Sequence, residues 1–322
     1  MKPSPNTLVS IVVPVYNEST LLYAFTETLE DVVQVLHLKW EIIFVDDGST
    51  DDTWSVLSDI HQTRESVMLI SLSRRFGKDT AVFAGMENAR GDAVVVIDAD
   101  LQDPPEIIPE MIEKWQSGND IIIGLRQDRQ GERFLRKLAT RFFYKLIQKI
   151  SDIDLPPDAG DFCLLDRRVV KEVNRFKERT RYFRGLIGWV GFRRAFVRYE
   201  RNPRQGGRSK WRYSQLAAFA IDAITSYSRL PLRIWTMTGI GAAMLGFLYG
   251  LYVLVYTLIT GGDVPGYASL VMIILLLGGT QLISIGVISE YIGHLFIEAK
   301  ERPLFIVREI KATQKTPHTH DH

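Results

Sequence analysis

The first feature of this sequence that suggests chemistry is a pair of carboxylates separated by one residue. Asp98 and Asp100 follow Val94–Ile97, a short apolar run typical of a buried strand. Two carboxylates at this spacing just beyond a strand can reach one hard divalent cation, with phosphate oxygens and water completing its octahedron. Such a cation screens a diphosphate and stabilises the charge that develops on it as it leaves. The pair therefore predicts a site for a divalent cation and a phosphorylated ligand.

Polar residues also follow the other expected strands. They are Pro14–Glu18 after the first strand, Asp46–Ser49 after the second, and Arg126, Arg129 and Arg133 after the fifth. Any single Asp or Asn at such a place has an ordinary alternative role as a helix N-cap or turn residue. Four strand ends that carry polar residues in the same way favour a ligand site over four separate caps.

Strand-like and helix-like stretches alternate through the first part of the chain. Short β-branched runs predict buried strands at 9–13, 41–45, 67–72, 93–97 and 120–124. Amphipathic stretches predict helices near 19–37, 52–64, 79–89 and 105–117. The alternation predicts a doubly wound α/β sheet, in which ligands bind beyond the carboxyl ends of the strands. No Gly-x-Gly-x-x-Gly follows the first strand and no Walker A sequence occurs, which argues against an NAD enzyme and a P-loop NTPase.

Composition excludes several other classes of protein. The 322 residues include 39 Lys and Arg against 38 Asp and Glu, and this balance gives no reason to expect a nucleic-acid partner. A single cysteine, Cys163, excludes an intramolecular disulfide and a cysteine-based zinc cluster, so we interpret it as a small buried side chain. The six histidines show no metal-ligand spacing, and we assign none of them a catalytic role.

Two long uncharged runs, Ile234–Gly262 and Val264–Ser289, predict a pair of membrane-spanning helices. Their glycines favour close packing of the two helices, and a buried hairpin of core helices is the alternative. Lys and Arg lie outside the pair and are absent from its turn-rich linker. The positive-inside rule then places both termini and the α/β domain in the cytoplasm, with the hairpin in the cell (inner) membrane. The apolar run Leu8–Tyr16 is too short for a signal peptide.

The sequence thus predicts five successive parts. They are an α/β domain at 1–211, a juxtamembrane amphipathic helix at 212–232, membrane helices at 233–260 and 267–290, and a cytosolic tail at 291–322. Within the second part, Ser214–Tyr227 carries few charges and is typical of a helix that lies at a membrane surface.

Three motifs resemble the inverting nucleotide-sugar glycosyltransferases with the GT-A fold: Val-Pro-Val-Tyr-Asn-Glu at 13–18, Val-Asp-Asp-Gly-Ser at 45–49 and Asp-Ala-Asp-Leu-Gln-Asp-Pro-Pro at 98–105. The chain is most similar to the polyprenyl-phosphate hexosyltransferases, namely dolichol-phosphate mannose synthases and, more closely, bactoprenol glucosyltransferases. Gly160-Asp161-Phe162 and Gly207-Arg208-Ser209-Lys210-Trp211 match that closer group. The resemblance covers roughly residues 8–310, and Ser289 departs from it where relatives often have Gly.

The resemblance implies a role for each matching residue. The nucleotide sugar would be bound by Pro14, Tyr16, Glu18, Val45, Asp46, Asp47, Lys78, Asp98, Ala99 and Gln102. Mg²⁺ or Mn²⁺ would be bound by Asp98, Asp100 and Gln102. Donor and acceptor phosphates would be bound by Arg126, Arg129, Arg201, Arg204 and Lys210. The catalytic group would comprise Asp161, Asp100 and Arg126, and Asp161 is open to two interpretations, a base or a positioning residue. The basic stretch Arg198–Arg212 is also open to interpretation as a collar for anionic lipid headgroups.

The expected activity is transfer of a hexose, glucose from UDP-glucose, onto undecaprenyl or another polyprenyl phosphate, for a glycan of the cell envelope. Mannose, N-acetylhexosamine and aminopentose donors are alternatives, because hydroxyl recognition depends on pocket geometry. A processive polysaccharide synthase is a poorer match, since Gln205–Arg208 is followed by Ser209 instead of Trp and only two spans are present. A non-catalytic nucleotide-sugar sensor or scaffold would need no intact metal site. The sequence leaves the oligomeric state open, a homo-oligomer included.

Overall fold

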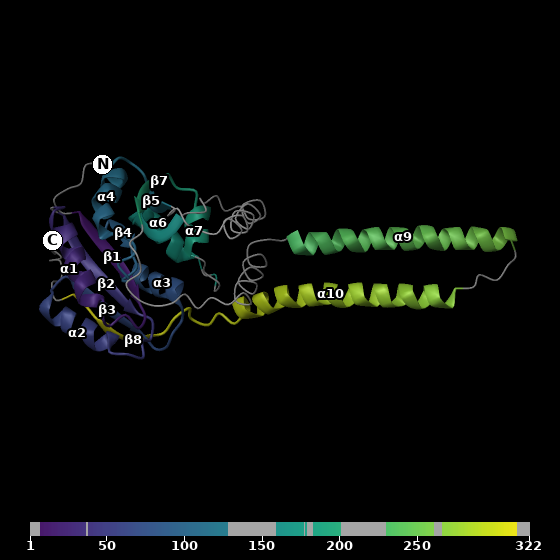
Figure 1. Ribbon diagram of the computed structural model, residues 1–322, viewed down its shortest axis with the longest axis horizontal. Coiled ribbons are helices and arrows are strands. Elements are labelled where there is room, and N and C mark those ends of the chain that lie inside the picture. Colours follow the sequence, from purple (N-terminus) through teal and green to yellow (C-terminus); the bar gives the residue numbers. More distant parts are fainter. Residues whose placement is uncertain are drawn as a thin grey trace, which may run out of the picture. The chain divides into compact units, whose positions relative to one another are not determined.

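The computed structural model describes residues 7–36, 38–127, 159–176, 178, 183–200, 230–260 and 266–313. The chain divides into two units, an α/β unit and a helical hairpin (Figure 1). Residues 212–229 of the juxtamembrane helix expected at 212–232 lie outside the described residues. The predicted site residues Arg129, Arg201, Arg204 and Lys210 also lie outside them.

The described part of the α/β unit is built on one eight-stranded sheet with the order β7-β5-β6-β4-β1-β2-β3-β8. Strands β4, β1, β2 and β3 run parallel, and β6 and β8 are antiparallel to their neighbours. The strands are β1 (Leu8–Val15), β2 (Lys39–Asp46), β3 (Val67–Leu72), β4 (Ala93–Val96), β5 (Ile121–Gln127), β6 (Ala159–Asp166), β7 (Arg194–Glu200) and β8 (Val307–Lys311).

Helices cover both faces of this sheet, because its central strands are apolar on both sides. One core layer packs β1 residues such as Ile11 and Val13 against α1, α2 and α4, and the other packs Val12 and Ile43 against α3, α6 and α7. The helices are α1 (Leu22–Gln34), α2 (Thr53–Thr63), α3 (Lys78–Asn88), the short 3-10 helix η1 (Pro105–Ile107), α4 (Ile108–Gln116), α6 (Arg167–Arg175) and α7 (Phe183–Trp189). The predicted α/β fold class, its first five strands and its first four helices are confirmed.

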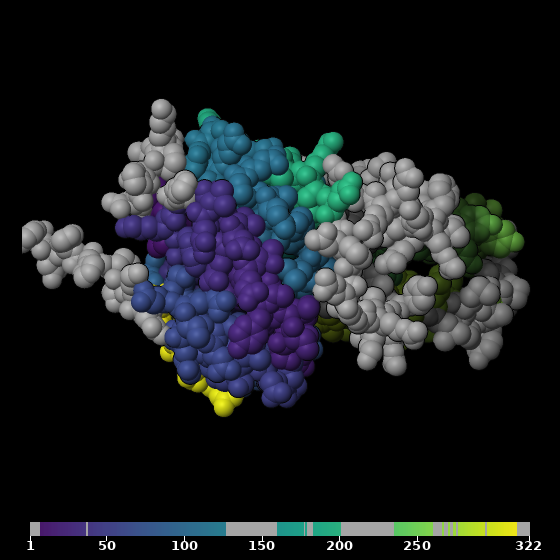
Figure 2. All heavy atoms as spheres, turned by 60° about the vertical axis from the view of Figure 1, so that its left-hand side comes forward, coloured from purple at the N-terminus to yellow at the C-terminus, as the bar shows by residue number. Residues whose placement is uncertain are grey.

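The strand β8 is an element that the sequence reasoning did not include. The segment expected as a tail forms a strand that pairs antiparallel with β3, from Leu72–Val307 to Leu69–Lys311. Lys311 contacts α2, where its Nζ donates to Ser58 Oγ at 2.9 Å and lies over the Trp54 ring. In Figure 2 the yellow C-terminal residues accordingly lie at the edge of the α/β unit. Residues 307–311 of the segment expected as a tail are therefore part of the sheet.

The second unit consists of α9 (Leu230–Thr260) and α10 (Tyr267–Ala299). The second helix continues beyond residue 290, the expected end, to Ala299. Within the described residues, Trp235–Ile259 and Leu276–Ala299 are long and apolar enough to cross a membrane, with mean hydropathy of 1.9 and 1.4. Among the described residues, a Cβ added at Gly239, Gly246 or Gly278 would meet nothing within 4 Å, so the close packing expected at the glycines is not seen there.

Candidate active site

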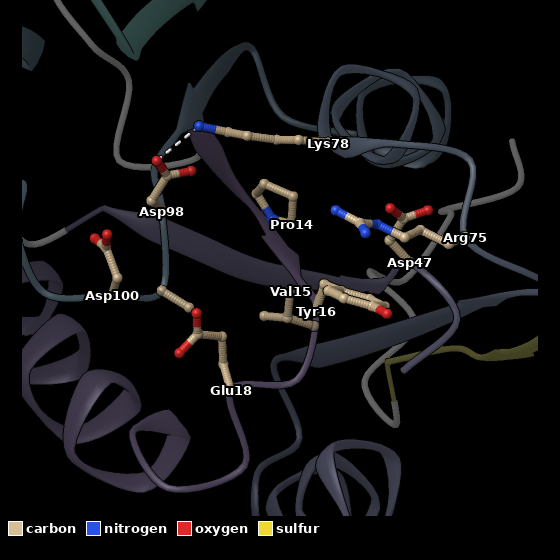
Figure 3. Close-up of a pocket in the computed structure, with 10 residues that line it drawn as sticks. Pro14, Val15, Tyr16, Glu18, Asp47, Arg75, Lys78, Asp98 and Asp100 are labelled. Atoms are coloured by element: carbon tan, nitrogen blue, oxygen red, sulfur yellow. Dashed lines mark hydrogen bonds and ion pairs between the residues drawn. The ribbon is translucent and has the colours of Figure 1, made fainter. Parts of the chain in front are cut away.

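A cavity of about 190 Å³ lies at the carboxyl edge of the parallel strands (Figure 3). Its walls come from the residues that end or follow β1, β2 and β4 and from the segment that leads into α3. They are Pro14, Val15, Tyr16, Glu18, Asp47, Arg75, Lys78, Asp98, Ala99 and Asp100. The structure therefore brings eight of the predicted site residues into one pocket, and these are Pro14, Tyr16, Glu18, Asp47, Lys78, Asp98, Ala99 and Asp100.

The loops around the pocket have constrained backbones. Asn17 and Leu101 have positive φ angles of 54° and 55°, which are uncommon for residues other than glycine. Asn17 accepts a hydrogen bond from Thr50 N and its own N–H donates to Ser49 Oγ, so the loops after β1 and β2 are tied together. Backbone strain of this kind persists where surrounding contacts enforce it, and it clusters at functional sites.

The two adjacent aspartates after β2 have different environments. Asp46 is buried, with an exposed fraction of 3%, and its carboxylate accepts hydrogen bonds from Ser49 N and Ser71 Oγ. Asp47 lines the pocket and accepts hydrogen bonds from the backbone N–H groups of Phe76 and Gly77. Burial raises the pKa of the Asp47 carboxyl, although those N–H groups oppose the shift. Asp46 therefore shapes the loop, while Asp47 also faces the ligand space.

Arg75 is a pocket residue that the sequence reasoning did not assign. Its guanidinium carbon lies 4.3 Å from the centre of the Tyr16 ring, and both side chains line the cavity. Figure 3 shows Arg75 beside Asp47. The feature of the sequence that could have indicated Arg75 is its position in Arg74-Arg75-Phe76-Gly77-Lys78, directly before a predicted helix.

The acidic pair offers oxygen ligands without forming a complete metal site. Asp98 Oδ2 accepts from Lys78 Nζ at 2.6 Å, and Asp100 Oδ1 accepts from Gln102 N at 3.1 Å. The second oxygen of each carboxylate has no hydrogen-bond partner among the described residues, and both residues line the pocket. No cluster of three or more His, Cys, Asp or Glu side chains in the described part of the chain could hold a metal ion. The pair therefore fits a hard cation that takes its remaining ligands from phosphate and water.

A chain of alternating charges extends from this pair. Lys78 Nζ lies 2.6 Å from Asp98 Oδ2 and 2.6 Å from Asp161 Oδ2, and Arg184 Nε donates to Asp161 Oδ1. Burial acts to lower the pKa of Lys78, but the two carboxylates overcome it and raise that pKa. Burial likewise acts to raise the pKa of Asp161, but Lys78 and Arg184 hold it below its usual value. Arg184 was not predicted, since it belongs to no recognisable motif.

Arg126 belongs to a neighbouring buried cluster. Its guanidinium is 3.2 Å from Asp103 Oδ2 and donates to the Tyr199 hydroxyl, which in turn donates to Asp103 Oδ1 at 2.6 Å. Burial acts to lower the pKa of Arg126, but Asp103 and Tyr199 overcome it and raise that pKa.

Some predicted site residues do not line the described cavity, and these are Arg126, Val45, Asp46, Gln102 and Asp161. Val45 is fully buried in the core, and Gln102 is 5% exposed.

The chain combines an α/β sheet that carries an acidic pair at its carboxyl edge with a hairpin of two long apolar helices. This combination fits a membrane glycosyltransferase of GT-A type. The chain belongs to glycosyl transferase family 2, whose model matches residues 10–173. A second model, the GtrB C-terminal hairpin, matches residues 230–295.

Curated relatives match almost the whole chain. An uncharacterized glycosyltransferase of Synechocystis sp. is 45% identical over 96% of this chain and 97% of its own length. The bactoprenol glucosyl transferase of Shigella phage SfV is 42% identical over 94% of this chain and 99% of its own. Among solved structures, glucosyl-3-phosphoglycerate synthase from Mycobacterium tuberculosis, in complex with Mn²⁺ and UDP-glucose, is 18% identical. Its TM-score is 0.44 over 68% of this chain and 77% of that chain.

Proposed function

We propose that this enzyme transfers glucose from UDP-glucose to a polyprenyl phosphate, in the first instance undecaprenyl phosphate, and releases UDP. The observation that carries the proposal is the combination of the acidic pocket with the GtrB-type hairpin in one chain. Relatives named bactoprenol glucosyl transferases, 41–42% identical over at least 94% of this chain, support the choice of sugar and lipid.

The donor nucleotide would occupy the cavity between the loops after β1 and β2. Tyr16 and Arg75 offer a stacked pair of planar groups against which a base can pack, and Asp47 offers a carboxylate for N–H donors. The diphosphate would extend toward Asp98 and Asp100. Gly48 keeps this arrangement compact, because a Cβ there would lie 2.5 Å from the carbonyl carbon of Arg74.

Asp98 and Asp100 would hold a divalent cation, Mg²⁺ or Mn²⁺, against the donor diphosphate, with Gln102 N fixing the Asp100 carboxylate. When bound, such a cation neutralises the charge that develops on the departing UDP. Lys78, which lines the same pocket, adds a second positive charge beside Asp98. The acidic pair, through the cation that it would hold, and the ammonium group of Lys78 would together place positive charge where the leaving group would form.

The acceptor needs little activation by the protein. A lipid monophosphate has a second pKa of about 6, so most of it is dianionic and nucleophilic near neutral pH. Direct displacement at the anomeric carbon inverts its configuration, so an α-linked donor would give a β-linked lipid phosphate. By the positive-inside rule, the α/β domain and both termini would lie on the cytoplasmic side of the membrane, where a nucleotide sugar is available.

Other sugars preserve this chemistry, and mannose, N-acetylhexosamine and aminopentose are the alternatives for the donor. A non-catalytic nucleotide-sugar scaffold would bind UDP-glucose but would not depend on the second carboxylate of the acidic pair. Asp100→Asn separates the two functions, because a scaffold tolerates the change and a transferase loses most of its turnover.

The test uses purified full-length protein in detergent with undecaprenyl phosphate, Mg²⁺ and a panel of labelled nucleotide sugars. Label that moves into the organic phase from UDP-glucose, and stops moving when EDTA is added, is the expected result. Transfer from GDP-mannose or another donor would replace glucose as the substrate and keep the mechanism. A folded protein that forms no lipid-linked product from any donor would overturn the transferase function.

A further inference from the structure

The Asp161 carboxylate lies between two cations that come from different helices. Asp161 is on β6, and its side chain is 15% exposed. Lys78 at the start of α3 binds Oδ2, and Arg184 in α7 binds Oδ1. Both oxygens of the carboxylate are therefore used by positively charged donors from elsewhere in the sequence.

This geometry is unfavourable for a proton acceptor. A general base needs an oxygen aimed at the proton that it removes and a pKa near the working pH. Asp161 presents its two oxygens to Lys78 and Arg184, and these cations also hold its pKa below the usual range. A phosphate acceptor is mostly ionised already, so the reaction proposed above does not require a base at this position.

The same geometry suits the binding of phosphate. An ammonium group carries three N–H donors and a guanidinium carries five, so each cation can bind Asp161 and a phosphate oxygen together. Lys78 also reaches Asp98 in the donor pocket. Arg184 does not line that pocket, and its charge acts on Arg126 in the neighbouring cluster. The two cations therefore extend from the donor pocket toward a different part of the site.

We propose that Asp161 is a positioning residue that fixes Lys78 and Arg184 as a pair of phosphate-binding cations, with Lys78 directed to the donor diphosphate and Arg184 to the acceptor phosphate. The inference rests on the proposed function and assigns a ligand to each half of its site. It also decides between the two roles that the sequence left open for Asp161.

The first experiment measures transfer kinetics while donor and lipid phosphate are varied separately. Arg184→Ala is expected to raise KM for the lipid phosphate about tenfold or more, the usual effect of losing a charged hydrogen bond, and to leave KM for UDP-glucose unchanged. Lys78→Met is expected to raise KM for UDP-glucose instead. Arg184→Lys should recover part of the loss, because a cation is retained.

Asp161→Asn tests the link between the cations. Its effect on the lipid phosphate KM should not add to that of Arg184→Ala in the double variant, since one change already releases the other group. A fall in kcat with both KM values unchanged, multiplying with the effect of Arg184→Ala, would overturn the proposal and identify an independent base. Asp166→Asn is the matched control, because Asp166 is another β6 carboxylate paired with an arginine, Arg168.

Calorimetry with UDP and Mg²⁺ gives a readout that does not need turnover. Lys78→Met and Asp161→Asn should weaken UDP binding to a similar extent, and Arg184→Ala and Asp166→Asn should leave it unchanged. Unchanged UDP affinity in Asp161→Asn would overturn the positioning role. If the wild type transfers no sugar, the proposed function fails, and these UDP affinities alone decide whether Asp161 positions Lys78.

Discussion

Two charge clusters lie at opposite edges of the same sheet, and they differ in how fully their oxygen atoms are used. At the amino edge Glu41 is 3% exposed, and its carboxylate accepts hydrogen bonds from Ser10 Oγ, Arg90 N and the Arg90 guanidinium. At the carboxyl edge Asp98 and Asp100 each keep one oxygen without a hydrogen-bond partner among the described residues, facing a cavity. The first cluster is complete within the described part of the chain, and we propose that a ligand completes the second.

The comparison teaches that a buried charge alone does not identify a functional site. Both edges carry carboxylates paired with Lys or Arg at 2.6–2.7 Å. What distinguishes them is the cavity and the strained loops with positive φ at Asn17 and Leu101, which occur at the carboxyl edge. Variants at the two edges should therefore affect different properties, with activity lost at one edge and stability at the other.

The largest effect is expected from Asp100→Asn. Loss of a carboxylate that would hold the cation should lower transfer by about 100-fold or more, equivalent to about 3 kcal/mol in the activation free energy. The unfolding transition should stay where it is in the wild type, because Asp100 accepts one hydrogen bond from its own loop. Radiolabel transfer and thermal unfolding, measured on the same preparation, check both statements. Activity retained within twofold would contradict the role of the acidic pair.

The opposite outcome is expected from Glu41→Ala. Removing the buried Glu41 carboxylate leaves Ser10 Oγ and Arg90 N without their acceptor, and leaves the partly exposed Arg90 guanidinium without its counter-charge. The loss of these hydrogen bonds should destabilise the α/β unit by about 3 kcal/mol. Specific activity of the folded fraction should stay close to that of the wild type. Denaturant unfolding and active-site titration separate the two quantities. A stable but inactive variant would show that the amino edge takes part in function.

A somewhat smaller effect is expected from Gly48→Ala. Gly48 has a φ of 68°, and an added Cβ would lie 2.5 Å from Arg74 C, so the segment that contains Arg75 has to move. Backbone strain of this kind costs about 2 kcal/mol, and KM for the donor should rise. Gly118→Ala is the control, since Gly118 also has a positive φ, 98°, with nothing within 4 Å of the added Cβ. Equal changes in donor KM for the two variants would disprove the role of the close contact.

The pH dependence of stability should reflect Asp79. Burial and the charge of Asp161 raise the pKa of Asp79 from 3.8 to about 6 in the folded protein. A carboxyl group whose pKa is raised on folding favours the folded state while it is protonated. This contribution to the free energy of unfolding is fully present below the unfolded pKa of 3.8, and it is lost as the pH rises through about 6. Asp79→Asn should therefore stabilise the protein above pH 6, by about 1 to 2 kcal/mol, and the gain should shrink as the pH falls to 4. Unfolding curves across this range provide the test, and a gain independent of pH would refute it.

The smallest effect is expected from Thr313→Val, just beyond β8. Arg90 donates to Thr313 Oγ1 at 2.6 Å, which joins the C-terminal segment to the amino-edge cluster. Loss of this hydrogen bond should cost about 1 kcal/mol and increase proteolysis of the C-terminal segment without changing transfer. Unaltered proteolysis together with unaltered stability would mean that the contact does not fasten the segment.

The sequence predicts the parts of this protein that depend on local patterns. Apolar β-branched runs predicted the first five strands, and residues at their carboxyl ends predicted most of the pocket. Arg184 and Asp103 escaped prediction because their partners, Asp161 and Arg126, are brought to them only by the fold. The strand β8 was not predicted because it lies at the edge of the sheet, where apolar and polar residues alternate only weakly along a strand. Val307 and Lys311 are half-buried, and the residues between them are exposed.

The central claim is that the carboxyl-edge pocket transfers a sugar to a lipid phosphate, and one side-by-side measurement tests it most directly. Wild type, Asp100→Asn and Glu41→Ala are incubated at a temperature where all three are folded, with labelled UDP-glucose, undecaprenyl phosphate and Mg²⁺. We expect lipid-linked label for the wild type and Glu41→Ala and almost none for Asp100→Asn. Equal label from the wild type and Asp100→Asn, or none from a folded wild type, would contradict it.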